Sequence, residues 1–82
     1  MTNKLVKKGG NMPLNNKLKY YREMKNINQQ DFGALVNVSR QTISSIERGD
    51  YSPSVTLALK IAKVLNVSVE EIFEYKEEEN EK

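Results

Sequence analysis

The segment from Gln29 to Gly49 constrains the fold more than any other part of this 82-residue sequence. Its apolar residues recur at helical spacing up to Val36, the pattern then breaks, and it resumes at Ile43. Ser39 stands just before the second run, where a hydroxyl can cap the free N–H groups of a first helical turn. Gly49 stands just after that run and can adopt the left-handed conformation that ends a helix. The segment therefore predicts two helices joined by a tight corner.

Three more short helices are predicted around this pair. The first follows an asparagine cap at position 15 or 16. The second spans residues 55–65, where apolar residues lie nearly all around the helix, as in the centre of a small bundle or in a helix with a second face for a partner. The third begins after Ser68 and includes Phe73. The sequence therefore predicts an all-α domain of five helices.

Gly33 lies inside the first helix of the central pair, where glycine costs about 1 kcal/mol relative to alanine. The two helices of such a corner cross at a steep angle, and a missing side chain lets the backbones approach. We therefore expect a close backbone contact at Gly33.

Charge is distributed unevenly along the chain, although the formal net charge is only +2. Residues 1–25 contain seven lysines and arginines and one glutamate, whereas residues 70–82 contain seven glutamates and two lysines. The first end therefore attracts polyanions and the other end repels them.

The chain is expected to have three parts: a flexible basic arm over residues 1–14, a folded domain over residues 15–75 and an acidic, solvated tail over residues 76–82. The arm has no sustained hydrophobic period and contains Gly9 and Gly10. A basic arm of this kind can reach into a minor groove or along the phosphates of DNA. The alternative is a disordered leader, with Met12 as an alternative start.

The absence of several residue types excludes whole classes of site. The sequence contains no cysteine and no histidine, so it offers no disulfide framework, no zinc site of the usual kind and no imidazole base. It has no glycine-rich phosphate loop, and its carboxylate cluster lies in the expected tail, so we do not expect an enzyme. No cofactor, metal or small-molecule ligand is evident. No apolar run approaches the roughly 20 residues of a membrane span, and we expect a cytoplasmic protein.

Polar residues occupy the outward side of the second helix of the pair. They are Arg40, Gln41, Thr42, Ser44 and Ser45. Hydrogen-bonding groups of this kind suit the base edges and phosphates of nucleic acid. Arg40 has the forked geometry for O6 and N7 of guanine, and Gln41 has that for N6 and N7 of adenine. The alternative for either side chain is a phosphate contact.

Residues 18–73 resemble a known family. The segments that carry the resemblance are LKYYRE, NQQDFGALVNVSRQTISSIERG and YSPSVTLALKIAKVLNVSVEEIF. They are similar to the phage-repressor or xenobiotic-response-element (Cro-type) helix-turn-helix domains, specifically to small single-domain bacterial transcription regulators. The resemblance implies a lambda-repressor-like DNA-binding domain with the helix-turn-helix at helices two and three. It also implies sequence-specific binding of double-stranded DNA, with repression favoured.

DNA contacts are implied for named residues. Base contacts in the major groove are expected at Arg40, Gln41, Ser44 and Ser45, and phosphate contacts at Gln29, Ser39 and Thr42. Lys19 is expected to add a phosphate contact, compensating for the lysine that many relatives carry where Ser45 stands. The alternatives are that Gln29 contacts only water, that Ser39 only caps its helix and that Thr42 faces solvent.

The resemblance also implies two contacts within the protein. Arg22 and Glu47 are expected to form a structural ion pair that ties the first helix to the back of the recognition helix. The hydrophobic surface of the fourth and fifth helices is expected to form a homodimer. Its candidate residues are Leu57, Ile61, Val64, Val69 and Phe73. A two-fold dimer places two recognition helices about 34 Å apart and selects a palindromic operator.

The main alternative function is a protein-interaction module, such as an antitoxin or an adaptor with the same fold. An extended apolar segment outside the helices would favour it, and Leu5-Val6 is a weak candidate. Binding to a membrane surface through the basic arm is disfavoured, because the arm lacks an amphipathic apolar face. A DNA-binding regulator is the preferred hypothesis.

Overall fold

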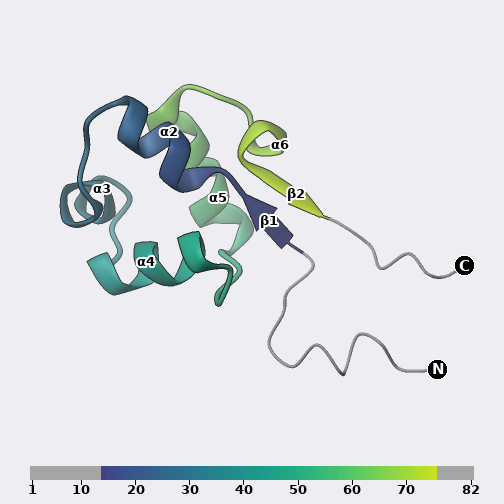
Figure 1. Cartoon of the computed structure of the whole chain (residues 1–82), viewed down its shortest axis with the longest axis horizontal. Coiled ribbons are helices and arrows are strands. Elements are labelled where there is room, and N and C mark those ends of the chain that lie inside the picture. Colours follow the sequence, from purple (N-terminus) through teal and green to yellow (C-terminus); the bar gives the residue numbers. More distant parts are fainter. Residues whose placement is uncertain (1–13, 76–82) are drawn as a thin grey trace, which may run out of the picture.

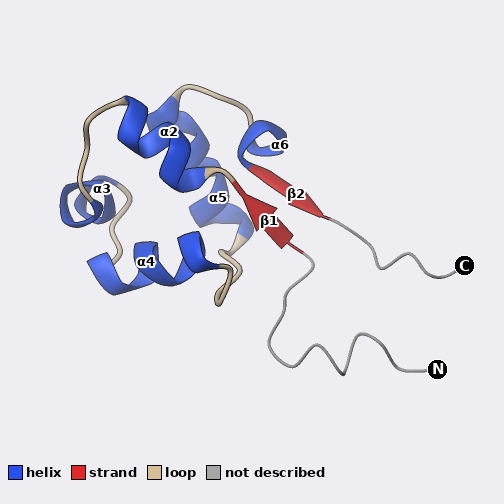
Figure 2. Ribbon diagram, in the orientation of Figure 1, coloured by secondary structure: helices blue, strands red, loops and turns tan. Residues whose placement is uncertain are grey.

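A computed structural model describes residues 14–75 of the chain. Its elements, in order, are β1 (Leu14–Asn16), α2 (Leu18–Met24), α3 (Gln29–Leu35), α4 (Arg40–Arg48), α5 (Val55–Leu65), α6 (Val69–Ile72) and β2 (Phe73–Tyr75). The helices cluster together, with α3 at one end of the molecule and the two strands at the other (Figure 1). Helices dominate the described part of the chain (Figure 2), so the predicted five-helix class is confirmed.

The apolar sides of the helices meet in one core. Leu18 of α2, Phe32 of α3, Ile43 of α4 and Ile61 of α5 are fully buried in it. The other buried apolar residues are Val36, Ile46, Leu57, Ala58, Ala62, Leu65, Ile72 and Phe73. Because Ile43 and Ile46 anchor one side of α4, its opposite side faces outward along the edge of the helical cluster (Figure 1).

Polar side chains define where four of the helices begin. The side-chain oxygens of Asn28, Ser39, Ser54 and Ser68 each accept a hydrogen bond from the backbone N–H three residues further on. These bonds satisfy N–H groups that a helix start leaves without partners. At Ser68 the bond is reciprocated, because the Glu71 carboxylate accepts from the Ser68 N–H at 2.7 Å. The predicted caps at Ser39 and Ser68 are confirmed.

Residues with left-handed backbone follow the helices α2, α3, α4 and α5. Asn26, Asn37, Gly49 and Asn66 have φ values of 58°, 65°, 84° and 61°. Asparagine and glycine adopt this conformation at lower cost than other residues. These residues turn the chain after α2, α3, α4 and α5, and Gly49 does so where the sequence predicted it.

The corner between α3 and α4 depends on Gly33. A Cβ atom at this position would lie 2.6 Å from the carbonyl oxygen of Val38, which is closer than real atoms approach. The Val38 N–H also donates to the Gly33 carbonyl at 2.9 Å. The predicted close contact is confirmed, and the backbone that approaches Gly33 belongs to the turn just before α4.

Two short strands were not predicted from the sequence. β1 and β2 pair antiparallel, with Leu14 opposite Tyr75 and Asn16 opposite Phe73. The prediction that Phe73 belongs to the fifth helix is therefore wrong, since α6 ends at Ile72. Asn16 does accept a bond from the Leu18 N–H at 3.1 Å, as a cap would, while its own backbone lies in β1.

The strands also revise the boundaries of the domain. Leu14 was expected to be the last residue of the arm, but it pairs with Tyr75 in the sheet. The remaining arm residues, 1–13, and the predicted tail, 76–82, lie outside the described residues.

Candidate nucleic-acid interface

The outward side of α4 carries a shallow hollow. Its lining consists of Arg40, Gln41, Ser44, Ser45 and Arg48. The four residues predicted to contact bases are therefore brought together on one surface, which Arg48 extends by a further turn. These five side chains carry two guanidinium groups and no carboxylate. The surface can accept the negative potential and the hydrogen-bonding edges of nucleic acid.

A second hollow adjoins the first at the start of α4. It is lined by Gln30, Ala34, Val38, Ser39, Arg40 and Gln41. Arg40 and Gln41 line both hollows, so they lie where the end of α3 meets the first turn of α4. Both side chains are exposed.

Arg48 makes three side-chain hydrogen bonds at the C-terminal end of the same surface. Its Nη1 donates to the Ser44 hydroxyl at 2.6 Å and its Nη2 to the Ser45 hydroxyl at 3.3 Å, while its Nε donates to Asp50 Oδ2 at 2.9 Å. The sequence analysis did not single out Arg48. The spacing of three and four residues from the serines, which brings helical side chains together, was the available signal.

Ser39 and Thr42 lie at the N-terminus of α4 and bond to each other. The Ser39 hydroxyl accepts from the Thr42 N–H, and the two hydroxyl oxygens are 3.1 Å apart. Ser39 therefore caps the helix. Thr42 is half-buried rather than directed wholly into solvent. Both hydroxyls remain at the edge of the surface that Arg40 begins.

A buried ion pair lies behind α4. Arg22 Nε donates to Glu47 Oε2 at 2.7 Å, and the two side chains are 8% and 5% exposed. Arg22 Nη2 also donates to Glu47 Oε1 at 3.1 Å, and Nη1 donates to the Ile27 carbonyl at 2.8 Å. The hydrogen bonds to Glu47 raise the pKa of Arg22 above its ordinary value, although burial acts in the opposite direction. The pair holds the back of α4 against α2 and the chain that enters α3.

Gln29 joins this network. Its Nε2 donates to Glu47 Oε1 at 3.0 Å, and the side chain is half-buried. The alternative that Gln29 contacts only water is therefore wrong. The bond uses one amide N–H and fixes the direction of the side chain at the first residue of α3.

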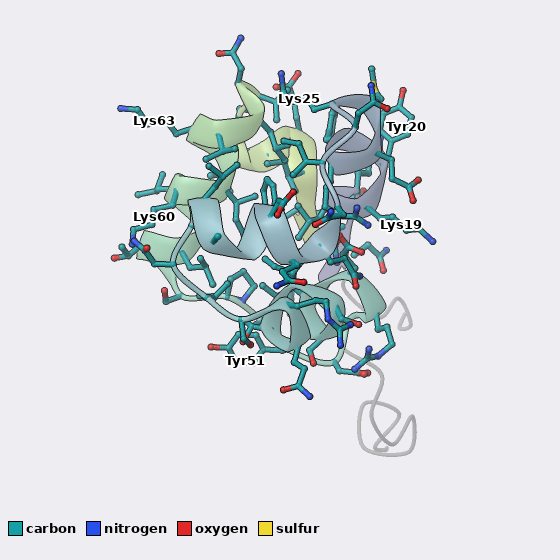
Figure 3. All side chains as sticks on the ribbon, turned by 90° about the vertical axis from the view of Figure 1, so that its left-hand side faces the viewer. Lys19, Tyr20, Lys25, Tyr51, Lys60 and Lys63 are labelled. Atoms are coloured by element: carbon teal, nitrogen blue, oxygen red, sulfur yellow. The ribbon has the colours of Figure 1, made fainter. Side chains whose placement is uncertain are left out.

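Lys19 stands apart from the two hollows. It is exposed on α2 and extends away from the molecule (Figure 3). Lys60 and Lys63 of α5 extend from the opposite side in the same view. Of these three lysines, only Lys19 lies on α2, the helix that carries Arg22 of the buried ion pair.

Comparison with known proteins identifies the family. A helix-turn-helix family model matches residues 18–72, which include all five helices. The chain belongs to the helix-turn-helix family. The phage-repressor, Cro-type relationship predicted from the sequence is confirmed.

Similar proteins match most of the chain. An uncharacterised HTH-type transcriptional regulator of Methanocaldococcus jannaschii is 52% identical over 66 residues, which are 80% of this chain and 100% of that protein. A second, from Bacillus subtilis, is 45% identical over 67 residues, or 82% of this chain and 100% of that protein. The crystal structure of the P22 c2 repressor with a synthetic operator is similar with a TM-score of 0.64 and 30% identity. It covers 66% of this chain and 82% of the repressor chain.

The predicted dimer residues of this helix-turn-helix regulator are mostly in its core. Ile61 is 0% exposed, and Leu57 and Phe73 are buried as well. In a single copy Ile61 has no exposed surface, and the other two have little. Val64 and Val69 are half-buried.

Other apolar side chains of the helix-turn-helix regulator are more exposed. Val55 is 76% and Leu59 is 57% exposed, one turn apart on α5, and Tyr51 is exposed in the preceding turn. Tyr51 lies in the lower part of the view in Figure 3, below Lys60.

No helix within residues 14–75 is long and apolar enough to cross a membrane.

Proposed function

We propose that this regulator binds an inverted repeat in double-stranded DNA as a homodimer, with α4 in the major groove, and represses transcription by occluding a promoter. The outward surface of α4 carries the proposal, because Arg40, Gln41, Ser44 and Ser45 line one hollow there. The similar P22 c2 repressor was solved with a synthetic operator, which supports DNA binding by this chain.

The four side chains would have different parts in base recognition. Arg40 and Gln41 begin α4, where a recognition helix contacts base edges. A bidentate contact from arginine to guanine or from glutamine to adenine contributes about 1–3 kcal/mol of discrimination. Ser44 and Ser45, one turn later, offer single hydroxyl contacts to the adjacent base pairs.

Phosphate contacts would orient α4 in the groove. Ser39 and Thr42 place two hydroxyls at the start of α4, and the bond between Gln29 and Glu47 fixes the Gln29 amide at the start of α3. Lys19 supplies a charge on the exposed side of α2. Each phosphate that the protein neutralises contributes about −0.9 to the slope of log K against log salt.

Dimerisation would use the apolar side of α5. Val55 and Leu59 are the large apolar residues of α5 that are exposed, and the exposed Tyr51 extends this surface. Burial of apolar surface favours association by roughly 25 cal/mol per Å². A palindromic site requires that the two-fold axis place the two copies of α4 about one turn of B-DNA apart, and we expect an axis through this side to do so.

The first test is selection of bound sequences from a randomised duplex pool at near-physiological salt. We expect an inverted repeat whose half-sites are about one helical turn apart. Arg40→Ala should change the recovered half-site at one position. Lys63→Ala, which removes a charge from the other side of the molecule (Figure 3), should not. If the folded protein enriches no sequence, the proposal fails and the protein-interaction alternative takes its place.

A further inference from the structure

All three guanidinium nitrogens of Arg48 donate hydrogen bonds to side chains of nearby residues in the sequence. Nη1 and Nη2 donate to the hydroxyls of Ser44 and Ser45, and Nε donates to the Asp50 carboxylate. A planar guanidinium presents its N–H groups in a fixed fork. The positions of the two serine oxygens are therefore tied to one rigid group.

The end of α4 brings the carboxylate to this group. Gly49 has a left-handed φ of 84°, and the Asp50 N–H donates to the Ser45 carbonyl at 2.9 Å. This turn closes the chain back over the last residues of the helix. This backbone turn thereby holds Asp50 beside Arg48, which favours the hydrogen bond between their side chains.

The hydrogen bonds from Arg48 restrict where the Ser44 and Ser45 hydroxyl protons can point. Each hydroxyl has one proton and two lone pairs. When Arg48 donates to a hydroxyl oxygen, the hydroxyl proton must turn away from the guanidinium. Ser44 and Ser45 then present O–H donors on the outward surface of α4, where they line the same hollow as Arg40 and Gln41.

We propose that Arg48 is a positioning residue for base recognition: it orients the Ser44 and Ser45 hydroxyls as donors, and Asp50 holds it in place. This inference rests on the proposed DNA-binding function. The base edges that match are acceptors in the major groove, namely N7 and O6 of guanine, N7 of adenine and O4 of thymine. The N4 amino group of cytosine is a donor and matches less well, because Arg48 already occupies one of the two lone pairs of each hydroxyl.

The positioning can be tested in the free protein. The measurement is the hydrogen-exchange rate of the Arg48 Nε–H by ¹⁵N NMR, assigned by its loss in Arg48→Lys. We expect exchange to be several-fold faster in Asp50→Ala, because the acceptor of this proton is removed. Both side chains are 58% exposed, so the variants should remain folded, and circular dichroism checks this. Equal rates in the two proteins would show that Asp50 does not hold Arg48.

The effect on recognition is measured by repeating the duplex selection with Arg48→Lys. Lysine keeps the charge but has one nitrogen, which cannot span both hydroxyls and the carboxylate. We expect an unchanged salt slope and an unchanged preference opposite Arg40. At the base pairs opposite the serines, the preference for acceptor edges should fall about tenfold. If Arg48 only contacts phosphate, Arg48→Lys leaves every base preference intact, and the inference is overturned.

A double-mutant cycle separates positioning from a direct contact. In the Ser44→Ala/Ser45→Ala background, Arg48→Lys should cause no further change in base preference. A change as large as in the original chain would mean that Arg48 contacts bases itself and would overturn the positioning role. If the original chain enriches no sequence, the proposed function fails, and the exchange measurement still decides whether Asp50 holds Arg48.

Discussion

The two ion pairs of α4 differ in their surroundings and therefore in their roles. Arg22 and Glu47 are almost completely buried, with four hydrogen bonds that also involve Gln29 and the Ile27 carbonyl. Arg48 and Asp50 are more than half exposed. A buried pair is costly to break, since the remaining charge has lost its partner away from water, whereas an exposed pair contributes about 0–1 kcal/mol.

Replacing Glu47 should therefore destabilise the fold far more than replacing Asp50. We expect Glu47→Ala to lower the free energy of unfolding by about 3–5 kcal/mol, because the Arg22 charge stays buried. Asp50→Ala should lower it by less than about 1 kcal/mol. Urea unfolding followed by circular dichroism measures both. Similar losses in the two variants would show that the Arg22–Glu47 pair is not buried in solution.

Arg40 should determine sequence preference, whereas Lys19 should determine affinity in general. Arg40→Ala should relax the preference at one base pair per half-site by about 1–3 kcal/mol. Lys19→Ala should weaken binding to all duplexes alike and reduce the salt slope by about 0.9. Fluorescence anisotropy on the selected site, on single-substituted sites and at several salt concentrations distinguishes them. An Arg40→Ala protein with unaltered preferences would exclude direct base contact by Arg40.

At the scale of elements, the α3–α4 corner sets the direction of α4, the proposed recognition helix. Its turn is closed by the contact between Gly33 and the Val38 carbonyl and by the left-handed Asn37. On the other side of α4, the Asn16 side chain of β1 donates to the Ile46 carbonyl at 2.8 Å. The helix is therefore held at its start by α3, which directly precedes it, and near its end by β1, which is distant in sequence.

A side chain at Gly33 should disturb this corner. Gly33→Val places atoms against the backbone of Val38, and overpacking of this kind typically costs about 1–3 kcal/mol. Ala34→Val is the matched control, since Ala34 is the next residue of α3 and is exposed. It should cost only the difference in helix propensity, about 0.5 kcal/mol. Thermal unfolding compares the two, and equal costs would contradict a tight corner.

The small sheet should contribute to stability through Phe73. This residue is buried in β2, whereas Tyr75 of the same strand is exposed. Phe73→Ala should lower the free energy of unfolding by about 3–5 kcal/mol, the usual cost of deleting a buried phenylalanine side chain. Tyr75→Ala should have a much smaller effect. Denaturant titrations of both variants test whether β2 is part of the cooperative core.

At the scale of the whole molecule, the proposed DNA-binding surface and the exposed apolar surface lie on different elements. The outward side of α4 carries the polar hollow, and α5 carries Val55 and Leu59. One copy can therefore contact DNA and a second copy at the same time. Two copies also double the number of phosphate contacts, so the salt slope of the complex should exceed that of a single domain.

Disruption of the α5 surface should separate dimerisation from folding. Leu59→Glu places a charge in the proposed interface, and we expect sedimentation velocity to show monomers that remain helical. Tyr20→Glu is the control, since Tyr20 is an exposed aromatic residue on the opposite side of the view in Figure 3 from Lys60, the neighbour of Leu59. It should leave the dimer intact. A dimer that persists in Leu59→Glu would place the interface elsewhere.

Local signals were enough to predict the helices and the corner. Ser39, Ser68 and Gly49 act within a few residues of themselves, so the sequence around them already indicates helix ends. The grouping of Arg40, Gln41, Ser44 and Ser45 was predictable for the same reason, because helical spacing alone puts them on one side.

Contacts between distant residues could be decided only by the tertiary structure. The pairing of Asn16 with Phe73 joins residues far apart in sequence, and neither three-residue strand has a pattern of its own. The burial of Ile61 depends on which sides of α5 the other helices cover, since that helix is apolar nearly all around. The sequence by itself therefore determined the family, the helices and the polar side of α4. The tertiary structure decided which apolar side chains remain exposed and which polar partners hold α4 in place.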